Sequence, residues 1–469
     1  MQRRSFLAAA LGAPALIRSQ TAERPNVLFI ASDDMNNDLG CYGHPIVKTP
    51  NLDRLAARGV RFDRAYCQYP VCGPSRCSLL TGLRPDSTGI FENNIAVRDK
   101  LPDVVTLPQL FKNSGWRSVR AGKMYHMDVP GSVGTNKWDD PPSWDVAISP
   151  PGSEQRTQGQ GGNILPGRRA AWHAIAFSGE GKDQADEKAT EIAMETISAN
   201  ANRPWFLGLG YLRPHLPHVA PARFFDLYPL GSIPAPVNAP NDLDDIPEAS
   251  EIAINTRAKD MGGMTEMQKK EAIRAYYASV SYMDWQVGRV LDALEKSDQS
   301  RRTIVVFWGD HGWHLGEHHR WHKRSLFEES MRAPLLIAAP GAKGSGKSTR
   351  SLVEFVDIYP TLADLARLKP PLNLEGQSLR PLLDNPSRPF KSAVFSVVTA
   401  PNGIEGRAAV NERYRYIRWT GPKPGEELYD RQTDPREFTN LAAMPRHKKT
   451  LDQMRAVLDA GWKAARARV

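Results

Sequence analysis

From residue 25 onward, short runs of apolar residues alternate with amphipathic segments. Four of these runs are typical of buried strands in a mostly parallel sheet, and each is followed by polar or charged residues. They cover residues 26–30, 117–121, 205–209 and 303–308. In open α/β sheets a ligand binds beyond the carboxyl ends of the strands. The pattern therefore predicts one site shared by four strand ends.

The segments between these runs carry apolar residues at helical spacing. We predict helices at residues 51–58, closed by Gly59, and at 183–199, 265–296 and 357–367. The apolar stripe of 265–296 is assigned to the core alone. Residues 130–181 and 217–260, which are rich in glycine, proline and polar residues, predict irregular segments that border the entrance to the site.

A smaller unit is predicted after residue 370. Short runs that suit hairpin strands cover residues 393–398, 408–411, 414–419 and 427–429, and a basic helix ends the chain. We therefore predict an α/β fold with a mostly parallel central sheet flanked by helices in residues 23–370. Residues 371–469 are predicted to form an α+β subdomain with an antiparallel sheet.

The first 22 residues predict an export signal. Arg3 and Arg4 precede an apolar run at residues 8–17, which is typical of the twin-arginine route. The run is too short to span a bilayer, and no other stretch is long and apolar enough. We expect an exported, periplasmic or extracellular protein without a transmembrane helix. No small-residue cleavage site is obvious near residues 18–22, so a retained or lipid-associated N-terminus stays open.

Charge and cysteine content narrow the function classes. The formal net charge of +9 over 469 residues suits an anionic partner. Nucleic acid is not predicted, because no helix-turn-helix, zinc-finger or aromatic RNA-binding signature is present. The cysteines at positions 41, 67, 72 and 77 are too few for a disulfide scaffold. A zinc cluster is disfavoured, because no histidine pair accompanies them and Pro74 intervenes.

Residues 70–82 predict a helix with a reactive residue at its start. Pro74 suits the first turn, and Gly82 suits a left-handed cap. Cys72 then lies just before the helix, where free N–H groups favour a thiolate or an oxyanion derived from the side chain. Arg76, one turn further, can fold back towards it. The alternative is a buried cysteine that acts as a small apolar residue.

The motif Cys72-x-Pro74-Ser75-Arg76, followed by residues 79–82 (Leu-Leu-Thr-Gly), resembles the signature of the type I sulfatases. Within that family the chain is most similar to the iduronate-2-sulfatase branch, over residues 24–442. The resemblance implies an alkaline-phosphatase-like fold and hydrolysis of sulfate esters. It also implies that a formylglycine-generating enzyme oxidises Cys72 to formylglycine, whose hydrated aldehyde attacks sulfur.

Acidic residues at two strand ends suggest a metal site. Asp33, Asp34 and Asp310 offer hard oxygen ligands, which suit Ca²⁺ or Mg²⁺ better than zinc. Adjacent acids at a strand end also occur as caps or surface charges. The resemblance implies a calcium site, with magnesium as the second choice, made by these residues, His311 and the modified Cys72. Many sulfatases have asparagine at the position of His311.

The resemblance also assigns catalytic roles. Lys123 and Lys323 match positions that hold the sulfate group, and Arg76 matches one that holds the aldehyde hydrate. His126 matches the residue beside the hydrate and is predicted to act as a base. His215 matches the family residue that faces the bridging oxygen and is predicted to act as a general acid. Taken singly, each is more often a solvated charge or a satisfied polar group.

The substrate is predicted from the branch resemblance and from one further cation. Arg213, beside His215, is predicted to meet a substrate carboxylate, which favours a 2-O-sulfated uronic acid in a sulfated polysaccharide. The histidines at positions 314, 318, 319 and 322 are interpreted as pocket wall or solvated loop, not as a metal site. The alternatives are a phosphodiesterase or phosphonate monoester hydrolase and a non-catalytic glycan-binding protein. The oligomeric state is not predicted.

Overall fold

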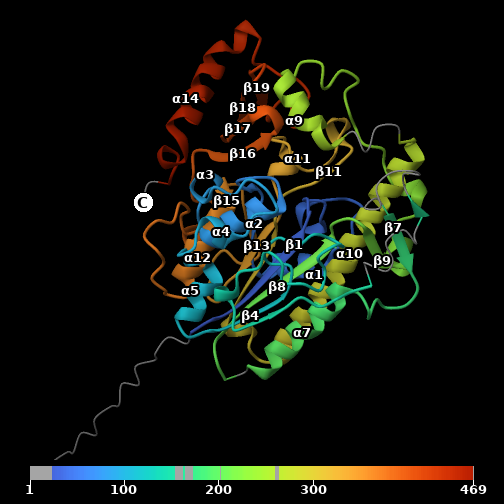
Figure 1. Cartoon of the computed structure of the whole chain (residues 1–469), viewed down its shortest axis with the longest axis vertical. Coiled ribbons are helices and arrows are strands. Elements are labelled where there is room, and N and C mark those ends of the chain that lie inside the picture. Colours follow the sequence, from blue (N-terminus) through green and yellow to red (C-terminus); the bar gives the residue numbers. More distant parts are fainter. Residues whose placement is uncertain (1–23, 154–161, 164–172, 201, 259–263, 468–469) are drawn as a thin grey trace, which may run out of the picture.

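The computed structural model describes residues 24–153, 162–163, 173–200, 202–258 and 264–467 (Figure 1). The predicted export signal at residues 1–22 lies outside the described residues. Within the described ranges, no helix combines the length and the apolar character needed to cross a membrane.

An eight-stranded sheet forms the centre of the molecule. Its order is β14-β2-β13-β10-β1-β8-β4-β5, and all strands except β13 run in the same direction. The bounds are β1 (Asn26–Asp33), β2 (Val60–Phe62), β4 (Arg117–Gly122), β5 (Val146–Ile148), β8 (Trp205–Pro214), β10 (Thr303–Gly309), β13 (Leu335–Ala338) and β14 (Lys347–Thr349). The four predicted strands are β1, β4, β8 and β10. They are neighbours in the sheet, in the order β10-β1-β8-β4. This part of the prediction is confirmed.

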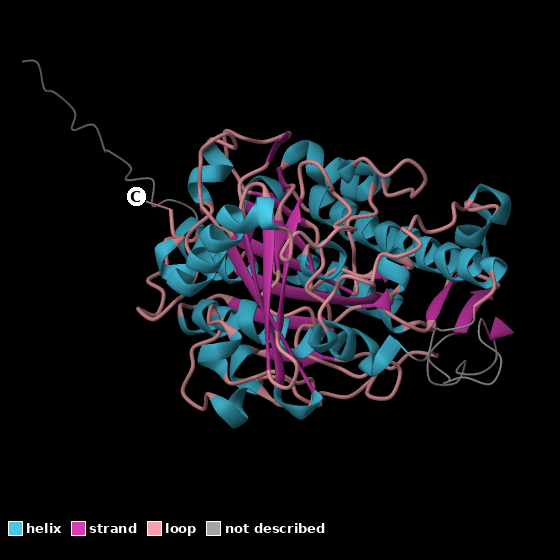
Figure 2. Cartoon of the chain, turned by 90° about the horizontal axis from the view of Figure 1, so that it is seen from above, coloured by secondary structure: helices cyan, strands magenta, loops and turns pink. Residues whose placement is uncertain are grey.

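Helices cover both faces of this sheet (Figure 2). Strand β1 shows why, because its side chains alternate between two cores. Leu28 and Ile30 pack with α1 (Pro50–Arg58), α7 (Ala185–Ala199) and α10 (Glu266–Lys296). Val27 and Phe29 pack with α2 (Cys72–Thr81), α5 (Leu107–Asn113) and α12 (Ile358–Leu365). A strand buried on both faces holds its carboxyl end in a fixed position.

Small elements complete the large unit. The strands are β3 (Ala65–Tyr66), β6 (Gly162–Asn163), β7 (His173–Phe177), β9 (His218–Pro221), β11 (His314–Leu315), β12 (Trp321–His322) and β15 (Val353–Glu354). The short helices are α3 (Pro85–Thr88), α4 (Val97–Lys100), α8 (Ala222–Asp226), α9 (Glu248–Ala258), α11 (Glu328–Met331) and α13 (Arg380–Asp384).

Gly59 caps α1, as predicted, in an extended conformation with φ of −120°. Two local predictions differ from the structure. Residues 130–181 are not irregular throughout, because β5 pairs with β4 and extends the central sheet. Cys72 is the first residue of α2 and does not precede it. The predicted left-handed cap at Gly82 is confirmed, with φ of 69°.

A four-stranded antiparallel sheet forms the C-terminal part, as predicted. Its strands are β16 (Val394–Ala400), β17 (Ile404–Val410), β18 (Tyr414–Thr420) and β19 (Gly425–Asp430). Helix α14 (Lys448–Ala464) packs on one face and α9 on the other (Figure 1). The domain boundary at residue 370 stays a prediction. Leu379, Leu382 and Leu383 pack in the core of the central sheet.

A buried arginine joins the C-terminal sheet to α11 and the residues before it. Arg415 on β18 donates hydrogen bonds to Glu437 at 2.6 Å, to the carbonyl of Leu326 at 2.9 Å and to Glu328 at the start of α11. Its side chain is fully buried. Because removing one partner of a buried ion pair leaves a charge unpaired, this contact should be important for stability.

We therefore expect Arg415→Ala to lower the free energy of unfolding by about 3–5 kcal/mol. The matched control is Arg418→Ala on the same strand, whose ion pair with Asp459 is exposed to solvent. That change should cost less than about 1 kcal/mol. Urea unfolding of both variants checks the difference, and equal losses would contradict the assigned role of Arg415.

Candidate active site

Four strand ends converge at one edge of the central sheet. Asp33 ends β1, Asp310 follows β10, Lys123 follows β4 and His215 follows β8. Strand β1 lies between β8 and β10, so its end is at the centre of the group. The next residue, Asp34, has φ of 59°, in the left-handed region that few non-glycine residues adopt. The backbone therefore turns sharply where the acidic pair stands.

The predicted metal ligands lie together. One oxygen from each of Asp33, Asp34 and Asp310 lies within 4.8 Å of the others. The same spacing joins Asp34, Cys72 and His311. All five side chains are buried. Helix α2 thus places Cys72 beside acids that are remote from it in the sequence.

The Cys72 thiol is not activated as a thiolate. Burial raises its pKa well above the usual value, and the negative charge of Asp33 adds to that effect. The start of α2 does not offset it, so of the two predicted anions the thiolate is disfavoured, and the oxyanion of a modified side chain stays a prediction. As an unmodified cysteine, Cys72 is protonated at neutral pH and is a weak nucleophile.

Arg76 holds the acidic groups in position. Its Nε donates to Asp310 at 2.9 Å, its Nη2 to Asp33 at 3.2 Å and its Nη1 to the carbonyl of Lys123 at 2.6 Å. Burial alone would raise the pKa of Asp33, but Lys123, His215 and Arg76 outweigh it and hold that pKa well below its usual value. Arg76 is therefore a positioning residue for two carboxylates. Its predicted contact with an aldehyde hydrate stays a prediction.

Two lysines reach the cluster. Lys123 donates to Asp33 at 2.5 Å, and Lys323 lies 2.9 Å from the Cys72 sulfur and contacts Asp34. Burial alone would lower the pKa of Lys323, but Asp34 and Cys72 outweigh it and raise that pKa. Lys323 and His215 keep 15% and 19% of their side-chain surface exposed, whereas the acids are fully buried. Access to the cluster is therefore on the side of these two residues.

Two histidines direct a lone pair into the cluster. Nδ1 of His311 donates to the carbonyl of Gly312 at 2.9 Å, which leaves Nε2 as an acceptor 3.3 Å from the Cys72 sulfur. Nδ1 of His215 donates to the carbonyl of Leu216 at 2.6 Å, and its Nε2 lies 3.6 Å from Asp34. Burial lowers the pKa of both imidazoles, so both are neutral at neutral pH.

His126 lies apart from the group of ligand atoms. Its Nε2 donates to Asp128 at 3.0 Å, and its buried Nδ1 has no hydrogen-bond partner among the described residues. Burial lowers the pKa of His126 to about 4. Asp128 was not predicted, although an acid two residues after a candidate base is a signal present in the sequence. The pair supplies a neutral imidazole with a free lone pair.

The side chain of Arg213 is not placed to bind a substrate carboxylate. Its side chain is 1% exposed, and Nη1 donates to the carbonyls of His215 at 2.8 Å and Pro217 at 2.7 Å. We therefore correct the prediction that Arg213 binds a substrate carboxylate. Its role in the structure is to hold the turn after β8 that carries His215.

Tyr276 on α10 supports the acidic loop, although its helix was assigned only to the core. Its hydroxyl donates to the carbonyl of Asp34 at 2.8 Å and accepts from the N–H of Asn36 at 2.9 Å. A tyrosine in an apolar stripe carries no sequence signal for such a contact, because only the hydroxyl at its tip takes part.

The acidic cluster fits a hard divalent cation. Oδ2 of Asp34 is buried and has no hydrogen-bond partner among the described residues. Burial raises the pKa of Asp34, and the charges of Asp33 and Asp310 add to that effect. A cation bound to these oxygens would satisfy the orphaned atom and offset the repulsion. Asp33, Asp34, Asp310 and His311 are the residues that would hold it.

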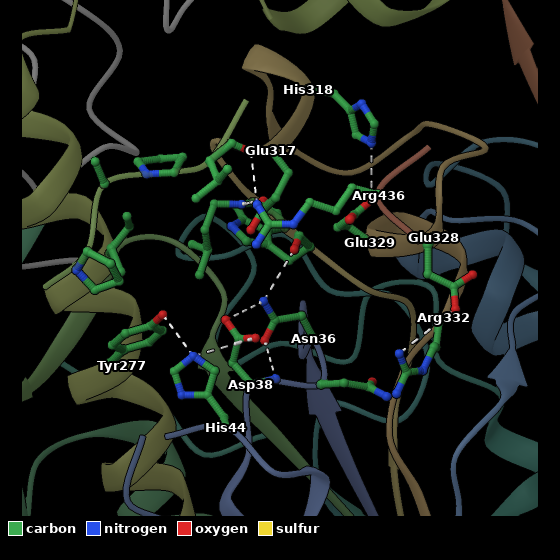
Figure 3. Close-up of a pocket in the computed structure, with 18 of the residues that line it drawn as sticks. Asn36, Asp38, His44, Tyr277, Glu317, His318, Glu328, Glu329, Arg332 and Arg436 are labelled. Carbon is green, nitrogen blue, oxygen red and sulfur yellow. Dashed lines mark hydrogen bonds and ion pairs between the residues drawn. The ribbon is translucent and has the colours of Figure 1, made fainter. Parts of the chain in front are cut away.

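A cavity of about 450 Å³ adjoins this site (Figure 3). Trp313 lines it, and the Lys323 ammonium lies 5.5 Å from the same ring. Its wall carries the carboxyl groups of Asp38, Glu317, Glu328 and Glu329. Burial raises the pKa of Asp38 to about 6 and that of Glu317 to about 7. The wall also carries the cationic side chains of Arg332 and Arg436.

The histidines of residues 314–322 are part of this wall or its support. His318 stacks on Phe327 at 3.9 Å and pairs with Asp242 at 3.0 Å. His314 contacts the hydroxyl of Ser325 at 2.9 Å, and His319 is exposed. Within the described ranges, none of them belongs to a group of converging metal ligands.

Comparison with known proteins decides the family. A family model described as Sulfatase matches residues 25–368, well over half of the chain. The chain belongs to the sulfatase family. A second model, described as N-sulphoglucosamine sulphohydrolase, C-terminal, matches residues 316–463. The sulfatase is therefore an enzyme of the sulfuric ester hydrolase class.

Two curated relatives extend over nearly the whole chain. The sulfatase is 36% identical to a protein named Sulfatase from Formosa agariphila, over 94% of this chain and 88% of that protein. It is 32% identical to the iduronate 2-sulfatase of Mus musculus, over 92% of this chain and 93% of that protein. The predicted resemblance to the iduronate-2-sulfatase branch is confirmed.

Solved structures confirm the predicted fold class. A 2-O GAG sulfatase has a TM-score of 0.73 and 25% identity, and the match covers 94% of this chain and 93% of that one. The phosphonate monoester hydrolase of Agrobacterium radiobacter has a TM-score of 0.78 and 24% identity, covering 94% and 96%. The second likeness shows the fold alone.

Proposed function

We propose that the sulfatase hydrolyses sulfate esters of sulfated carbohydrates, with 2-O-sulfated uronic acid in a polysaccharide as the preferred group. The observation that carries this proposal is the buried cluster at the carboxyl ends of four strands, in which Cys72 contacts Lys323, His311 and Asp34. The relatives named iduronate 2-sulfatase and 2-O GAG sulfatase support the sugar and the position.

The reaction needs a nucleophile, positive charge on the sulfuryl oxygens and a proton for the leaving alkoxide. Formylglycine at position 72 would supply the hydroxyl nucleophile, and Ca²⁺ would lower the pKa of that hydroxyl. Lys123 and Lys323 would hold the sulfate group. Arg76 keeps Asp33 and Asp310 in place. The proposal includes a formylglycine-generating enzyme as partner and export by the twin-arginine route to the periplasm or beyond.

Two histidines have different roles in the proposed proton transfers. His126 is neutral, with its Nδ1 lone pair free, so it is the proposed base. His215 lies at the exposed side of the cluster and is the proposed acid for the bridging oxygen. Because the lysines beside His215 lower its pKa in addition to burial, it would take up a proton once the sulfate group has neutralised them.

The role of His126 predicts the acid side of the pH profile. A base with a pKa lowered to about 4 stays unprotonated at a lower pH than an ordinary histidine. We therefore expect kcat to fall as the pH falls through about 4, and not near 6.5. The hydrogen bond that His126 donates to Asp128 raises the pKa of His126, so Asp128→Asn should move this fall to lower pH. Kinetics on an aryl sulfate in both proteins check this, and an unmoved profile would contradict the assignment.

Substrate choice is tested with two pairs of compounds. We expect an aryl sulfate to turn over faster than the matching aryl phosphate, and a disaccharide with a 2-O-sulfated uronate faster than one with a 6-O-sulfated hexosamine. Sulfate release is the measurement. A preference for the phosphate would favour the phosphodiesterase or phosphonate hydrolase alternative. Activity on the 6-O-sulfated compound alone would refute the uronate.

A further inference from the structure

A second cavity, of about 890 Å³, lies between the edge of the central sheet and the C-terminal sheet. Ser348 on β14 and Asp63 after β2 form one wall, and the turn between β17 and β18 with Asn411 and Tyr414 forms another. Residues 386–387 and 389–392, just before β16, complete it. None of its lining residues belongs to the cluster around Cys72. We call this cavity the inter-sheet groove.

Three of the six charged side chains that line the inter-sheet groove are already in ion pairs: Asp63, Lys391 and Arg413. Asp63 accepts from Arg61 at 2.7 Å, and Arg413 donates to Asp430 at 2.9 Å. Lys391 is buried against Glu354 and Asp357. These groups hold the walls together and have little charge left for a ligand.

Three arginines at the groove are not paired. Arg64 and Arg350 line it, and Arg64 donates to the carbonyl of Glu412 at 3.3 Å. Arg388 is exposed and lies between the lining residues Ser387 and Pro389, and its carbonyl accepts from the Ser351 hydroxyl at 2.8 Å. No ion pair is recorded for any of the three among the described residues. Burial lowers the pKa of Arg64, and the positive charges of Arg431 and Arg350 add to that effect. The one unpaired acid of the lining is the exposed Glu412, so the groove keeps a surplus of positive charge.

The other lining groups suit a carbohydrate. Serine side chains and Asn411 offer hydroxyl and amide groups, and Phe390 and Tyr414 offer aromatic rings. Unpaired guanidinium groups bind sulfate and carboxylate through parallel N–H donors. A sugar ring with sulfate or carboxylate substituents presents all three kinds of group. Nucleic acid would share the charge but would not need the hydroxyl-rich wall.

We infer that the inter-sheet groove is a second binding site, which holds a segment of sulfated polysaccharide at a distance from the reacting sugar. The inference rests on the proposed function for the nature of the ligand. Arg64 and Cys72 are eight residues apart in sequence, so their Cα atoms are separated by at most about 29 Å. A long polysaccharide can therefore occupy both sites at once, which raises its local concentration at Cys72.

The test uses a variant with Arg64→Gln, Arg350→Gln and Arg388→Gln in the full chain. Its matched control is Lys296→Gln, Arg301→Gln and Lys449→Gln, which removes the same charge from exposed residues elsewhere. Heparin binding is measured by titration calorimetry, and kinetics are measured on heparin and on an aryl sulfate. We expect the groove variant to lose at least about tenfold in heparin affinity and the control to lose less than about twofold.

The kinetics separate binding from chemistry. The groove variant should raise KM for the polysaccharide and leave kcat/KM for the aryl sulfate within about twofold of the parent. Equal heparin affinity in the two variants, or an equal loss on the aryl sulfate, would overturn the inference. Tight binding of single-stranded DNA that is lost in the same variant would also overturn the inference, because it would show that the groove binds anions in general.

Two further results keep the test decisive. If the triple variant does not fold, the exposed Arg350→Gln alone should still lose about threefold in heparin affinity, and no loss would overturn the inference. If heparin binds through the three arginines but no polysaccharide loses sulfate, the proposed function fails and the groove stands. The two claims are therefore distinguished by one set of measurements.

Discussion

Cys72→Ala should abolish sulfate release and leave a folded protein. The expected loss in kcat is at least about 10⁴-fold, because the change removes the only proposed nucleophile. The fold should persist, since Val71 caps α2 without a side-chain hydrogen bond and Lys323 keeps its contact with Asp34. Truncating one buried sulfur should cost about 1 kcal/mol of stability. Initial rates on an aryl sulfate and a thermal unfolding curve are the measurements.

Cys77→Ala is the matched control for this change. Cys77 lies on the same helix and is also buried, but it is not among the groups that converge on the acids. We expect normal kcat and a similar small loss in stability. Full activity in Cys72→Ala, or an equal loss in both variants, would contradict the assignment of the nucleophile.

Asp310→Asn should disable the metal site. The change removes one of three buried carboxylates within 4.8 Å of each other and leaves Nε of Arg76 without its anionic partner. Loss of a group that only supports a metal ligand lowers metal affinity by about 10- to 100-fold. Loss of a ligand itself should cost more, so we expect calcium affinity to fall by at least about 100-fold. Bound calcium per chain, measured by elemental analysis at fixed free calcium, should fall together with kcat.

Asp284→Asn is the control for a buried aspartate outside the site. Asp284 on α10 accepts from the N–H groups of Leu52 at 2.7 Å and Asn51 at 3.1 Å. Its loss should reduce stability but not the calcium content of the folded enzyme. Unchanged calcium content in Asp310→Asn would show that the acidic cluster is not the metal site.

The strand ends that build the site are predictable because their signals are local. A buried strand such as β1 reads as an apolar run, and Asp33 follows that run directly. Parallel pairing then brings the ends to one edge without further information. The role of Cys72 on α2 is predicted from the resemblance of its motif to the family signature. The apolar pattern therefore predicts where the acids, Lys123 and His215 lie, and the family resemblance predicts what they do.

Side-chain direction at the strand ends was not predictable. Arg213 looks like a free cation beside His215, but the pairing of β8 with β1 shifts in register between Ser32 and Asp33. That shift involves two strands remote in sequence, and the guanidinium turns to backbone carbonyls. Strand β5 is not predictable from the sequence, because its three apolar residues are too short a run to indicate a strand and are ordered by pairing with β4.

The central claim is that Cys72 becomes formylglycine within this cluster. Trypsin should release residues 65–76, which contain Cys67 and Cys72, because Arg64 and Arg76 border the peptide. In active enzyme made with a formylglycine-generating enzyme, mass spectrometry after alkylation should show a labelled Cys67 and an aldehyde at position 72. A fully active preparation in which both cysteines carry the alkyl label would contradict the account.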